Sequence, residues 1–570
     1  MPLKICRISS MIWFRVLLLH ITVSSFLISQ DSLVWMSPVD HDVRLSGNFM
    51  ELRTNHFHTG IDIKSSTGKP GDTIRVVADG FVSRIKVQNG DYGLVVYLDH
   101  PNEYTSVYAH LHQFNSELEA YVKEMQYALE SYELDIYPSD SLFKFKAGEY
   151  LGLMGNTGRS FGPHLHFEIR ETESEKPIDP EAFGFAPDDH VLPTLQSFHV
   201  YHFEEADTPV DMETLYFSET GKTYSLHRNL IEARTGKIAF GVTAFDQIDG
   251  SSNRNGINAY RLFVNDSLAF QWKAENYSFA ESKRINGFFD YRQYILNSLR
   301  IYKLFAPSCS ALDFFEAGQS GILNIEEGKQ YGIRIEINDA QGNMVSLPFS
   351  VVGIKTEDPL KASVHCDSSF VIKKGMFEIS FEKESFFEWP AAKTIEKSQE
   401  LVLGKNSHRL DVFDRTVPLA KYFRISCPLP PGDPNQWCYI MKDNRGSWSV
   451  FSSDTLGGKL HSYIDQCGTL FLYQDTSPPE ISLIDMNESF AKAWIFKIKD
   501  NLIPDGKTPD LTYRASANGK WLRFKYDLKT DALIFDDFDK LPDTNFIFEL
   551  TVSDAQGNRS SFEKQFIRQK

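Results

Sequence analysis

The chain has 570 residues, of which 42% are hydrophobic and 13% aromatic, so it is long enough for three or four domains with separate hydrophobic cores. Its formal net charge of −17 argues against a nucleic-acid binder, because no basic stretch is available to neutralise a phosphate backbone. Glycine and proline, with 35 and 25 residues, are near average usage, which argues against a collagen-like or broadly disordered chain.

The start of the chain differs in composition from the rest. Lys4 and Arg7 precede an apolar run at 16–28, and this order of basic and then apolar residues is typical of a secretory signal. The run is shorter than the roughly 20 apolar residues that span a bilayer, and no later segment is long and apolar enough to do so. We therefore predict a signal segment over 1–30 and an exported mature chain without a transmembrane span.

Residues 31–189 form the first predicted domain, a compact antiparallel β-sheet. Its segments are rich in β-branched and aromatic residues and are separated by turns that contain glycine, asparagine or proline. The predicted strands are 73–77, 81–87, 94–98 and 104–109.

One helix is expected beside this sheet, in an insertion over about 113–146. Ser116 and Glu119 have the Ser-x-x-Glu spacing of a capping box, and Pro138 ends the helical pattern. Apolar residues recur between them at helical spacing, namely Leu118, Val122, Met125, Leu129 and Tyr132.

The remainder is predicted to form about three β-sandwich-like modules, which makes the whole chain mainly β. Proline-containing boundaries place the first β module at 190–356, the second at 357–476 and the third, of immunoglobulin-like size, at 477–570. The segments 337–343 and 552–558 share the residues Asp-Ala-Gln-Gly-Asn, which supports a common architecture but also suits any hairpin turn. These modules carry no catalytic constellation, and we expect them to position the first domain or bind a cell-envelope protein.

Five of the six cysteines would remain after removal of the signal segment. No pair has the C-x-x-C spacing of a zinc ribbon or a redox motif. An exported chain permits disulfides, and Cys427 with Cys438 is the first candidate pair.

Histidines cluster in the first domain as three His-x-His pairs, and a carboxylate follows one of them by four residues. On the predicted strand 164–168, alternation directs both histidines and a glutamate to one face. An isolated pair of this kind is more often a half-buried strand whose histidines satisfy hydrogen bonds, so the other pairs decide the interpretation. The residues are His56 and His58, His110 and His112, His164 and His166, with Asp62 and Glu168.

Geometry limits how these residues can share a metal ion. Four residues of extended strand cover about 13 Å, so the chain must bend between His58 and Asp62 for both to reach one ion, and Gly60 tolerates such a bend. His164 and His166 lie about 6.6 Å apart on one strand face, so one can bind a metal while the other faces a substrate. Two histidines and one aspartate leave one position of a tetrahedral zinc ion open, which is the catalytic pattern.

These segments resemble the lysostaphin and LytM type of zinc endopeptidase, which cuts peptidoglycan cross-bridges. The resemblance runs from about Asn48 to Arg170 and is specific, because separate segments agree in both order and residue type. They are His58-x-x-x-Asp62, Tyr108-Ala109-His110-Leu111, and Gly155-x-x-Gly158 leading into Gly162-Pro163-His164-Leu165-His166-Phe167-Glu168.

The resemblance implies one Zn²⁺ ion held by His58, Asp62 and His166, with His110 and His164 as the catalytic histidines. One of these two would accept the proton of water, and the other would stabilise the oxyanion or protonate the leaving amine; the sequence leaves open which does which. Glu168 is either a general base or, as we favour, a supporting residue.

Other residues near the motifs have weaker claims. His56 and His112 have no counterpart in the family pattern and are expected to be structural or exposed. Tyr108 and Asn156 either line a cleft or serve packing and the turn. The insertion after His110 is longer than in compact members of the family, so we expect a wall or lid that restricts the substrate.

The expected function is that of an exported zinc metalloendopeptidase in the periplasm or cell envelope of a bacterium, hydrolysing peptide cross-bridges or stems of peptidoglycan. The alternative is a LytM-like adaptor without enzymatic activity, which would activate a separate cell-wall hydrolase. A third possibility is a binding scaffold with a vestigial first domain.

Overall fold

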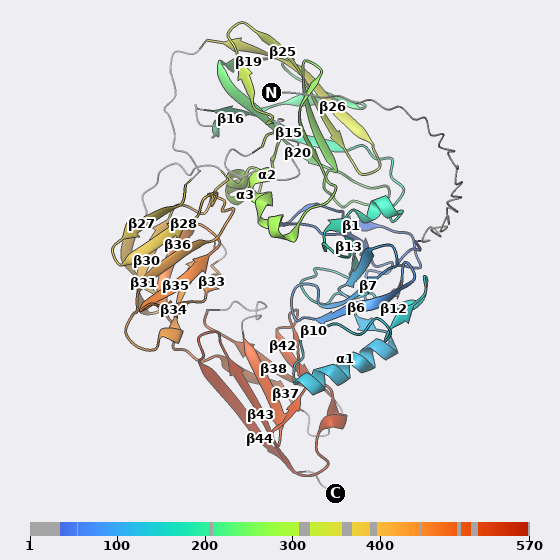
Figure 1. Cartoon of the computed structure of the whole chain (residues 1–570), viewed down its shortest axis with the longest axis vertical. Helices are drawn as coiled ribbons and strands as arrows, with labels where there is room; N and C mark the ends of the chain where they lie inside the picture. Colours follow the sequence, from blue (N-terminus) through green and yellow to red (C-terminus); the bar gives the residue numbers. More distant parts are fainter. Residues whose placement is uncertain are drawn as a thin grey trace, which may run out of the picture.

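The computed structural model describes residues 35–53, 55–203, 209–306, 320–355, 368–387, 396–443, 446–486, 492–502 and 511–567. The predicted signal segment lies outside the described residues. The prediction of a mainly β protein is confirmed, since antiparallel sheets make up most of the described chain (Figure 1). Within these residues, no helix combines the length and the apolar character that a membrane crossing requires.

The first domain is built on a nine-stranded sheet and a three-stranded sheet, with a hydrophobic core between them. The predicted strands lie within one or two residues of those observed. The large sheet has the order β1 (Leu45–Gly47), β4 (Ile61–Lys64), β13 (His164–Glu171), β8 (Tyr104–Ala109), β7 (Leu94–Asp99), β6 (Gly80–Val87), β10 (Leu134–Ile136), with β11 (Lys144–Phe145) on β6 and β14 (Pro177–Ile178) on β13. The small sheet has the order β5 (Thr73–Arg75), β12 (Tyr150–Leu153), β9 (Gln113–Phe114), and β2 (Leu52–Arg53) pairs with β3 (His56–Phe57).

The predicted helix is present as α1 (Ser116–Leu129), but its cap differs from the expected one. The N-cap is Asn115, whose side-chain oxygen accepts a hydrogen bond from the backbone N–H of Leu118 at 3.0 Å. Ser116 is therefore the first helical residue, not the cap. The helix ends before Tyr132 because Glu130 adopts a left-handed conformation and the chain then forms β10 against β6.

The first β module contains two sheets that enclose a large hydrophobic core. One has the order β16 (Pro209–Leu215), β15 (Thr194–Phe203), β20 (Gly236–Phe245), β23 (Tyr302–Lys303), with β24 (Leu323–Ile325) on β20. The other has the order β17 (Phe217–Thr220), β18 (Thr223–Leu226), β26 (Met344–Ile354), β25 (Gln330–Asn338), β21 (Ala259–Val264), β22 (Ser267–Lys273), with β19 (Leu230–Arg234) on β26. Short helices are η1 (Pro180–Phe183), which precedes the module, and η2 (Phe279–Arg284), α2 (Ile285–Phe288) and α3 (Tyr291–Asn297) within it.

The second and third β modules are also pairs of antiparallel sheets. The second has the orders β27 (Phe370–Lys374), β28 (Phe377–Phe381), β31 (Phe423–Pro428), β35 (Lys459–Ile464), β34 (Asp454–Leu456) and β29 (Glu396–Val402), β30 (Lys405–Val412), β36 (Gly468–Gln474), β32 (Trp437–Lys442), β33 (Trp448–Phe451), with η3 (Pro434–Gln436). The third has the orders β37 (Glu480–Asp485), β38 (Trp494–Lys499), β42 (Ala532–Phe535), β41 (Lys525–Asp527) and β40 (Lys520–Leu522), β39 (Thr512–Ala517), β43 (Phe546–Ser553), β44 (Arg559–Phe566), with η4 (Phe538–Lys540).

The candidate disulfide between Cys427 and Cys438 is wrong. Both thiols are free and buried, as is that of Cys467. Cys427 lies on β31 and faces the core between the two sheets of the second module, where the hydroxyl of Tyr439 donates to its sulfur at 3.5 Å. Cys438 lies on β32 beside Tyr439, whose side chain faces that core. Because neighbouring residues of a strand point to opposite faces, Cys438 faces away from the core and belongs to a separate hydrophobic cluster that includes Leu502 of the third module.

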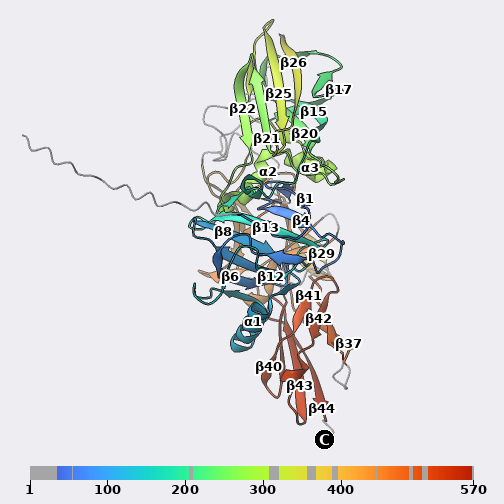
Figure 2. The same ribbon diagram turned by 90° about the vertical axis from the view of Figure 1, so that its right-hand side faces the viewer.

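The first domain and the three predicted modules are arranged one after another in a closed loop of domains, in which the third module returns to the first domain (Figure 1). The core of the first β module also includes Phe49, Met50, Leu52 and Phe57 of the first domain, so this hydrophobic cluster crosses the predicted boundary at 189. Seen from the side, the first domain lies between the first and third modules (Figure 2). The exact module limits stay predictions.

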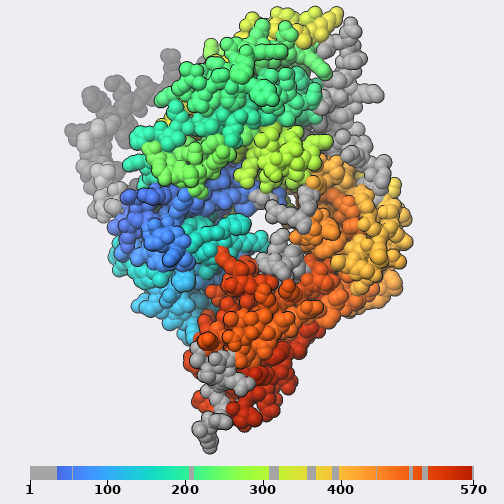
Figure 3. All heavy atoms as spheres, turned by 180° about the vertical axis from the view of Figure 1, so that it is seen from behind, coloured from blue at the N-terminus to red at the C-terminus, as the bar shows by residue number. Residues whose placement is uncertain are grey.

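Helix α1 makes the contact that closes the loop. Asp537 of the third module forms an ion pair with Lys123 and accepts a hydrogen bond from the hydroxyl of Tyr127 at 2.9 Å. The Tyr127 ring also packs edge-on against Trp521, with their centroids 5.3 Å apart. The space-filling view shows the C-terminal module, in red, against the blue and cyan first domain (Figure 3).

Candidate metal and active site

Strand pairing in the large sheet brings the predicted site residues together. β4 and β13 are antiparallel neighbours, and Asp62 lies directly opposite His166. On the other side of β13, β8 places Ala109 opposite His166, so His110 follows at the end of that strand. His58 precedes β4 and turns back over it. The site therefore lies on one face of three adjacent strands, with His58 above it.

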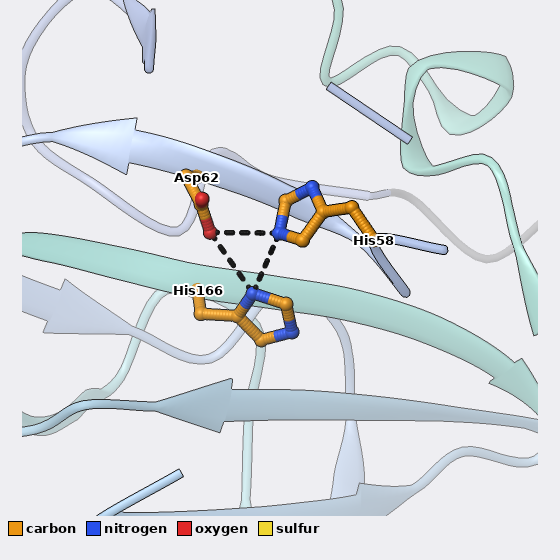
Figure 4. Close-up of side chains that lie close together, drawn as sticks. All are labelled: His58, Asp62 and His166. Atoms are coloured by element: carbon orange, nitrogen blue, oxygen red, sulfur yellow. Dashed lines mark hydrogen bonds and ion pairs between the residues drawn. The ribbon is translucent and has the colours of Figure 1, made fainter. Parts of the chain in front are cut away.

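Three side chains converge on one point (Figure 4). Nε2 of His58, Nδ1 of His166 and Oδ1 of Asp62 lie 2.9, 2.9 and 3.0 Å from one another. Ligand atoms about 2.0–2.1 Å from a tetrahedral zinc ion are about 3.3 Å apart, so this triangle is close to the size that such an ion requires. All three residues are buried.

The hydrogen bonds on the far side of each ring fix which nitrogen carries the proton. Nδ1 of His58 lies 2.7 Å from the carbonyl oxygen of Asn48, and Nε2 of His166 lies 2.7 Å from Oε1 of Glu168. Carbonyl and carboxylate oxygens only accept, so these ring nitrogens donate. The two opposite nitrogens then present lone pairs to each other and to the Asp62 carboxylate. Three hydrogen-bond acceptors that converge on one point repel one another unless a cation lies between them. Two imidazoles and one carboxylate are a set of ligands that fits zinc.

The bend between His58 and Asp62 contains Gly60, as expected, but for a different reason. A Cβ atom at this position would lie 2.1 Å from the carbonyl oxygen of Phe167 and 2.8 Å from Cγ of Glu168. The glycine is therefore required by the close approach of this turn to β13.

Glu168 accepts the N–H of His166 on the side of the ring that faces away from Asp62. Its Oε1 also accepts hydrogen bonds from the hydroxyls of Tyr92 and Thr59 at 2.5 Å each, while Nε of Arg170 donates to Oε2 at 2.6 Å. Burial alone would raise the pKa of Glu168, but the charge of Arg170 and the hydrogen bond from His166 hold that pKa well below its usual range. The carboxylate is fully buried and faces no open space, which favours the supporting role over that of a general base.

Asp62 is oriented from its other oxygen. The guanidinium of Arg53 donates to Oδ2 at 3.0 Å, which leaves Oδ1 directed at the histidines. Burial would raise the pKa of Asp62, but the charge of His58 and the hydrogen bonds from the surrounding histidines hold it well below its usual range. Without a metal ion, a second proton on Nδ1 of His166 takes the place of the cation: burial disfavours this charged form, yet hydrogen bonds with Asp62 and Glu168 outweigh it and raise the pKa of His166 to about 9. The charges and hydrogen bonds around Asp62 and His166 therefore stabilise a positive charge between these two residues.

His110 and His164 form a second pair beside the triangle. Their ring centroids are 4.9 Å apart, and Nε2 of His164 lies 3.4 Å from Oδ1 of Asp62. Nδ1 of His110 donates to the carbonyl oxygen of Thr157 and Nδ1 of His164 to that of Gly162, each at 2.8 Å. Burial, followed by the charges of His164 and His166, lowers the pKa of His110 to about 3. In each ring Nδ1 therefore carries the proton, and the lone pair of Nε2 points away from the carbonyl oxygen that Nδ1 binds.

A cavity of about 910 Å³ opens over all five residues. Its walls include the exposed Phe161 and, from the first β module, Tyr277 and Phe279. None of the lining residues comes from the insertion at 113–146, which the structure describes in full, so the expected wall or lid is wrong. The insertion instead contacts the third module through α1, and the first β module supplies that wall.

The remaining candidates lie at the margin of the site. His56 and His112 are both exposed, and of the two only His56 lines the cavity. Tyr108 is fully buried, and its hydroxyl accepts a hydrogen bond from the backbone N–H of Val77, so it is a packing residue. Asn156 is outside the cavity lining, and its side-chain oxygen accepts a hydrogen bond from Lys529 of the third module at 2.8 Å.

The sequence interpretation missed the residues that hold these side chains in place. Arg53 and Tyr92 lie outside the ligand motifs and Thr59 is an unspecified position within His58-x-x-x-Asp62, so no spacing or pattern assigns these three residues a role. The carbonyl groups of Asn48 and Thr157 act through the backbone, which leaves no signal in residue type.

The fold and the convergent histidines and aspartate define a mainly β domain with a candidate metal site. Residues 56–127 and 143–180 match the family model described as peptidase family M23, so the chain contains a domain of that family. The unmatched stretch, 128–142, falls within the insertion.

Curated relatives support this assignment. The domain is 33% identical over 129 residues to the DD-carboxypeptidase/endopeptidase Mpg of Neisseria meningitidis, which covers 23% of this chain and 23% of that protein. It is 32% identical over 139 residues to the peptidoglycan DD-endopeptidase ShyA of Vibrio cholerae, covering 23% and 26%. The chain thus spans about a quarter of the length of these relatives. Among solved structures, the catalytic domain of lysostaphin from Staphylococcus simulans is 20% identical and covers 25% of this chain and 91% of that one, with a TM-score of 0.18.

Proposed function

We propose that this protein is an exported zinc endopeptidase that hydrolyses peptide bonds in the cross-bridges or stems of bacterial peptidoglycan. The observation that carries the proposal is the convergence of His58, Asp62 and His166 beneath a cavity that also exposes His110 and His164. The names of the relatives, which are peptidoglycan or DD-endopeptidases, support the substrate class and a place in the cell envelope.

The residues of the chain divide the chemistry between them. His58, Asp62 and His166 would hold zinc, which supplies a Lewis acid that polarises a carbonyl and acidifies water. Nε2 of His110 or of His164 takes the proton from the attacking water, because each ring has its Nδ1–H bound to a carbonyl and its Nε2 lone pair available. The other ring takes up a proton from solvent and donates it to the carbonyl oxygen or to the leaving amine, while the first ring releases the proton of the water to solvent. Phe161 and Phe279 border the cleft and offer apolar contacts to a bound peptide.

The charge of the cavity fits the proposed substrate. Lys86 and Arg159 line it together with Lys64, although the protein as a whole is acidic. Positive side chains around the cleft favour a peptide with free carboxylates, and part of this attraction is lost as salt screens it.

The decisive experiment combines zinc analysis with digestion of defined cross-linked muropeptides. The wild-type chain is expected to contain one zinc ion and to cleave the cross-link. In His166→Ala, zinc is lost and cleavage falls by at least about 100-fold, because one of three ligands is removed. His112→Ala is the matched control, since it removes an exposed histidine of the same His-x-His pattern outside the cavity.

Two results would contradict the proposal. Cleavage that persists in His166→Ala would place the chemistry elsewhere. A wild-type protein that binds no zinc and cleaves no muropeptide, but stimulates a separate hydrolase, would establish the adaptor function instead.

A further inference from the structure

Two groups of three aspartates lie outside the peptidase site, one at each of two module junctions. Within each group, one carboxylate oxygen from every residue lies within 4.8 Å of the others. We refer to them as the first triad and the second triad. The first triad is Asp189, Asp246 and Asp339, and the second is Asp475, Asp500 and Asp554.

The two triads occupy corresponding places in two modules that share part of their strand order, β22-β21-β25-β26 in the first and β40-β39-β43-β44 in the third. The first aspartate of each precedes the opening strand of its module, β15 or β37, and the second ends the strand paired with it, β20 or β38. The third begins the turn of a long hairpin, β25–β26 or β43–β44. These are the two turns that share the residues Asp-Ala-Gln-Gly-Asn, and their similarity therefore extends beyond the needs of a hairpin.

The asparagine of each turn ties the triad together. The backbone N–H of Asn343 donates to one oxygen of Asp339 at 2.8 Å, and its side-chain amide donates to the other at 2.7 Å and to the carbonyl of Asp189 at 3.2 Å. Asn558 makes the same three contacts, to Asp554 at 2.8 and 2.8 Å and to the carbonyl of Asp475 at 3.2 Å. In each triad the asparagine therefore holds the first and third aspartates in the same relative arrangement.

A separate observation is that each triad contains carboxylate oxygens without a hydrogen-bond partner. Oδ2 of Asp189, Oδ1 of Asp246 and Oδ2 of Asp475 are buried and make no hydrogen bond, and their residues are 7%, 3% and 0% exposed. A buried carboxylate oxygen without a partner is unfavourable, and two more carboxylates beside it increase that cost. Burial and the charges of Asp339 and Asp189 accordingly raise the pKa of Asp246 to about 8. Lys405 does not supply the missing partner in the second triad. Its ammonium group donates instead to the carbonyl oxygen of Gln474 and to the hydroxyl of Thr476.

A fourth carboxylate faces the first triad from the first domain. Glu181 accepts a hydrogen bond at 2.6 Å from the amide of Gln341, which lies in the same turn as Asp339. Burial and Asp179, followed by the charges of Asp246 and Asp339, raise the pKa of Glu181 to about 8. A cation of high charge at this junction would allow these neighbouring carboxyl groups to ionise together.

We propose that each triad binds one Ca²⁺ ion. The residues of both triads offer carboxylate oxygen atoms, which a hard cation such as Ca²⁺ prefers, and its coordination number of 6–8 leaves room for backbone carbonyls and water. Each site joins two parts of the chain. The first triad links the end of the first domain to the first β module, and the second links the end of the second module to the third. Calcium would therefore fix the angle between neighbouring modules at both junctions.

The test is calorimetric titration of the full-length chain with Ca²⁺, after treatment with a chelator and saturation with zinc so that the peptidase site is filled. The wild type is expected to bind two Ca²⁺ ions with dissociation constants below about 1 mM. Asp246→Asn and Asp500→Asn should each bind one ion, and the double variant none. Asp266→Asn is the matched control and should bind two, because Asp266 is an exposed aspartate in another hairpin turn.

Thermal unfolding separates lost binding from damaged folding. Calcium should raise the melting temperature of the wild type, and each single variant should lose part of that increase. Without calcium, both variants should be at least as stable as the wild type, because asparagine removes a repelling charge. No calcium binding by the zinc-saturated wild type, or two ions still bound in both variants, would overturn the proposal.

Discussion

At the scale of single residues, the site depends on groups that decide where protons lie. His58 and His166 each give one N–H to a fixed acceptor, which directs the other nitrogen at Asp62. The two acceptors differ, since Asn48 offers a backbone carbonyl and Glu168 a carboxylate that is itself held by Arg170. A carboxylate behind a metal-binding histidine raises the basicity of that ring and fixes its orientation.

Glu168→Gln tests this support directly. Glutamine keeps the size of the side chain but removes the negative charge that stabilises the N–H of His166. We expect zinc affinity to fall by about 10–100-fold, with a matching loss of cleavage at limiting zinc. Competition with a chromophoric chelator measures the affinity.

Glu171→Gln is the control for this change, because Glu171 lies on the same strand but is exposed. It should bind zinc as the wild type does. Unchanged zinc affinity in Glu168→Gln would show that the carboxylate does not support the ligand. A melting temperature measured without zinc reveals any separate cost of leaving Arg170 without its partner.

The motifs named His58, Asp62, His110, His164 and His166 in advance, and the structure brings all five to one cavity. Their spacing predicted this because strand alternation and antiparallel pairing determine which side chains share a face. The acceptors of Asn48, Thr157 and Gly162 could not be predicted, since a backbone carbonyl is present at every residue. Arg53 and Tyr92 reach the site through tertiary packing alone.

At the scale of elements, strands were easier to predict than the ends and contacts of α1. The strands of the first domain alternate and are punctuated by turns, and both signals are local. The start of α1 depended on a choice between two adjacent capping residues, Asn115 and Ser116. Its partner surface lies about 400 residues later in the chain, at Trp521 and Asp537, and local sequence says nothing about it.

The cap of α1 yields a prediction that distinguishes the two residues. Asn115→Ala removes the acceptor for the N–H of Leu118, and we expect it to lower the free energy of unfolding by about 1 kcal/mol. Ser116→Ala should change the free energy of unfolding by less than about 0.5 kcal/mol, because Ser116 already lies inside the helix, where alanine has a higher helix propensity than serine. Denaturant titration followed by circular dichroism measures both. A larger effect of Ser116→Ala would show that the serine caps the helix.

At the scale of the whole molecule, the insertion has a role that its position beside His110 did not indicate. It forms the contact by which the third module closes the loop, while the first β module contributes Tyr277 and Phe279 to the cavity. The third module also reaches the glycine-rich turn before His164, where Lys529 donates to the side chain of Asn156. The peptidase domain is thus held by modules on two sides, and the first β module lines part of its cleft.

Asp537 is the centre of the closing contact and gives it a defined pH dependence. Burial would raise the pKa of Asp537, but hydrogen bonds from Lys123 and Arg523, with the charge of Arg523, lower it below the usual 3.8. A carboxyl whose pKa is lower in the folded state stabilises that state above its unfolded pKa, and the stabilisation is lost as the pH falls through the folded value. The closing contact should therefore be intact at neutral pH and weaken below about pH 4.

Asp537→Asn should lower the free energy of unfolding by about 1–3 kcal/mol at neutral pH, because it removes a largely buried acceptor of charged hydrogen bonds. Calorimetry of the wild type and the variant at decreasing pH should show the difference shrink as Asp537 becomes protonated in the wild type. Asp539→Asn, an exposed neighbour in η4, should match the wild type throughout. If the loop opens when this contact is lost, small-angle scattering will show a larger radius of gyration for Asp537→Asn at neutral pH and for the wild type only in acid. An unchanged radius in both would mean that the interface of Tyr127 with Trp521 keeps the loop closed without the ion pair.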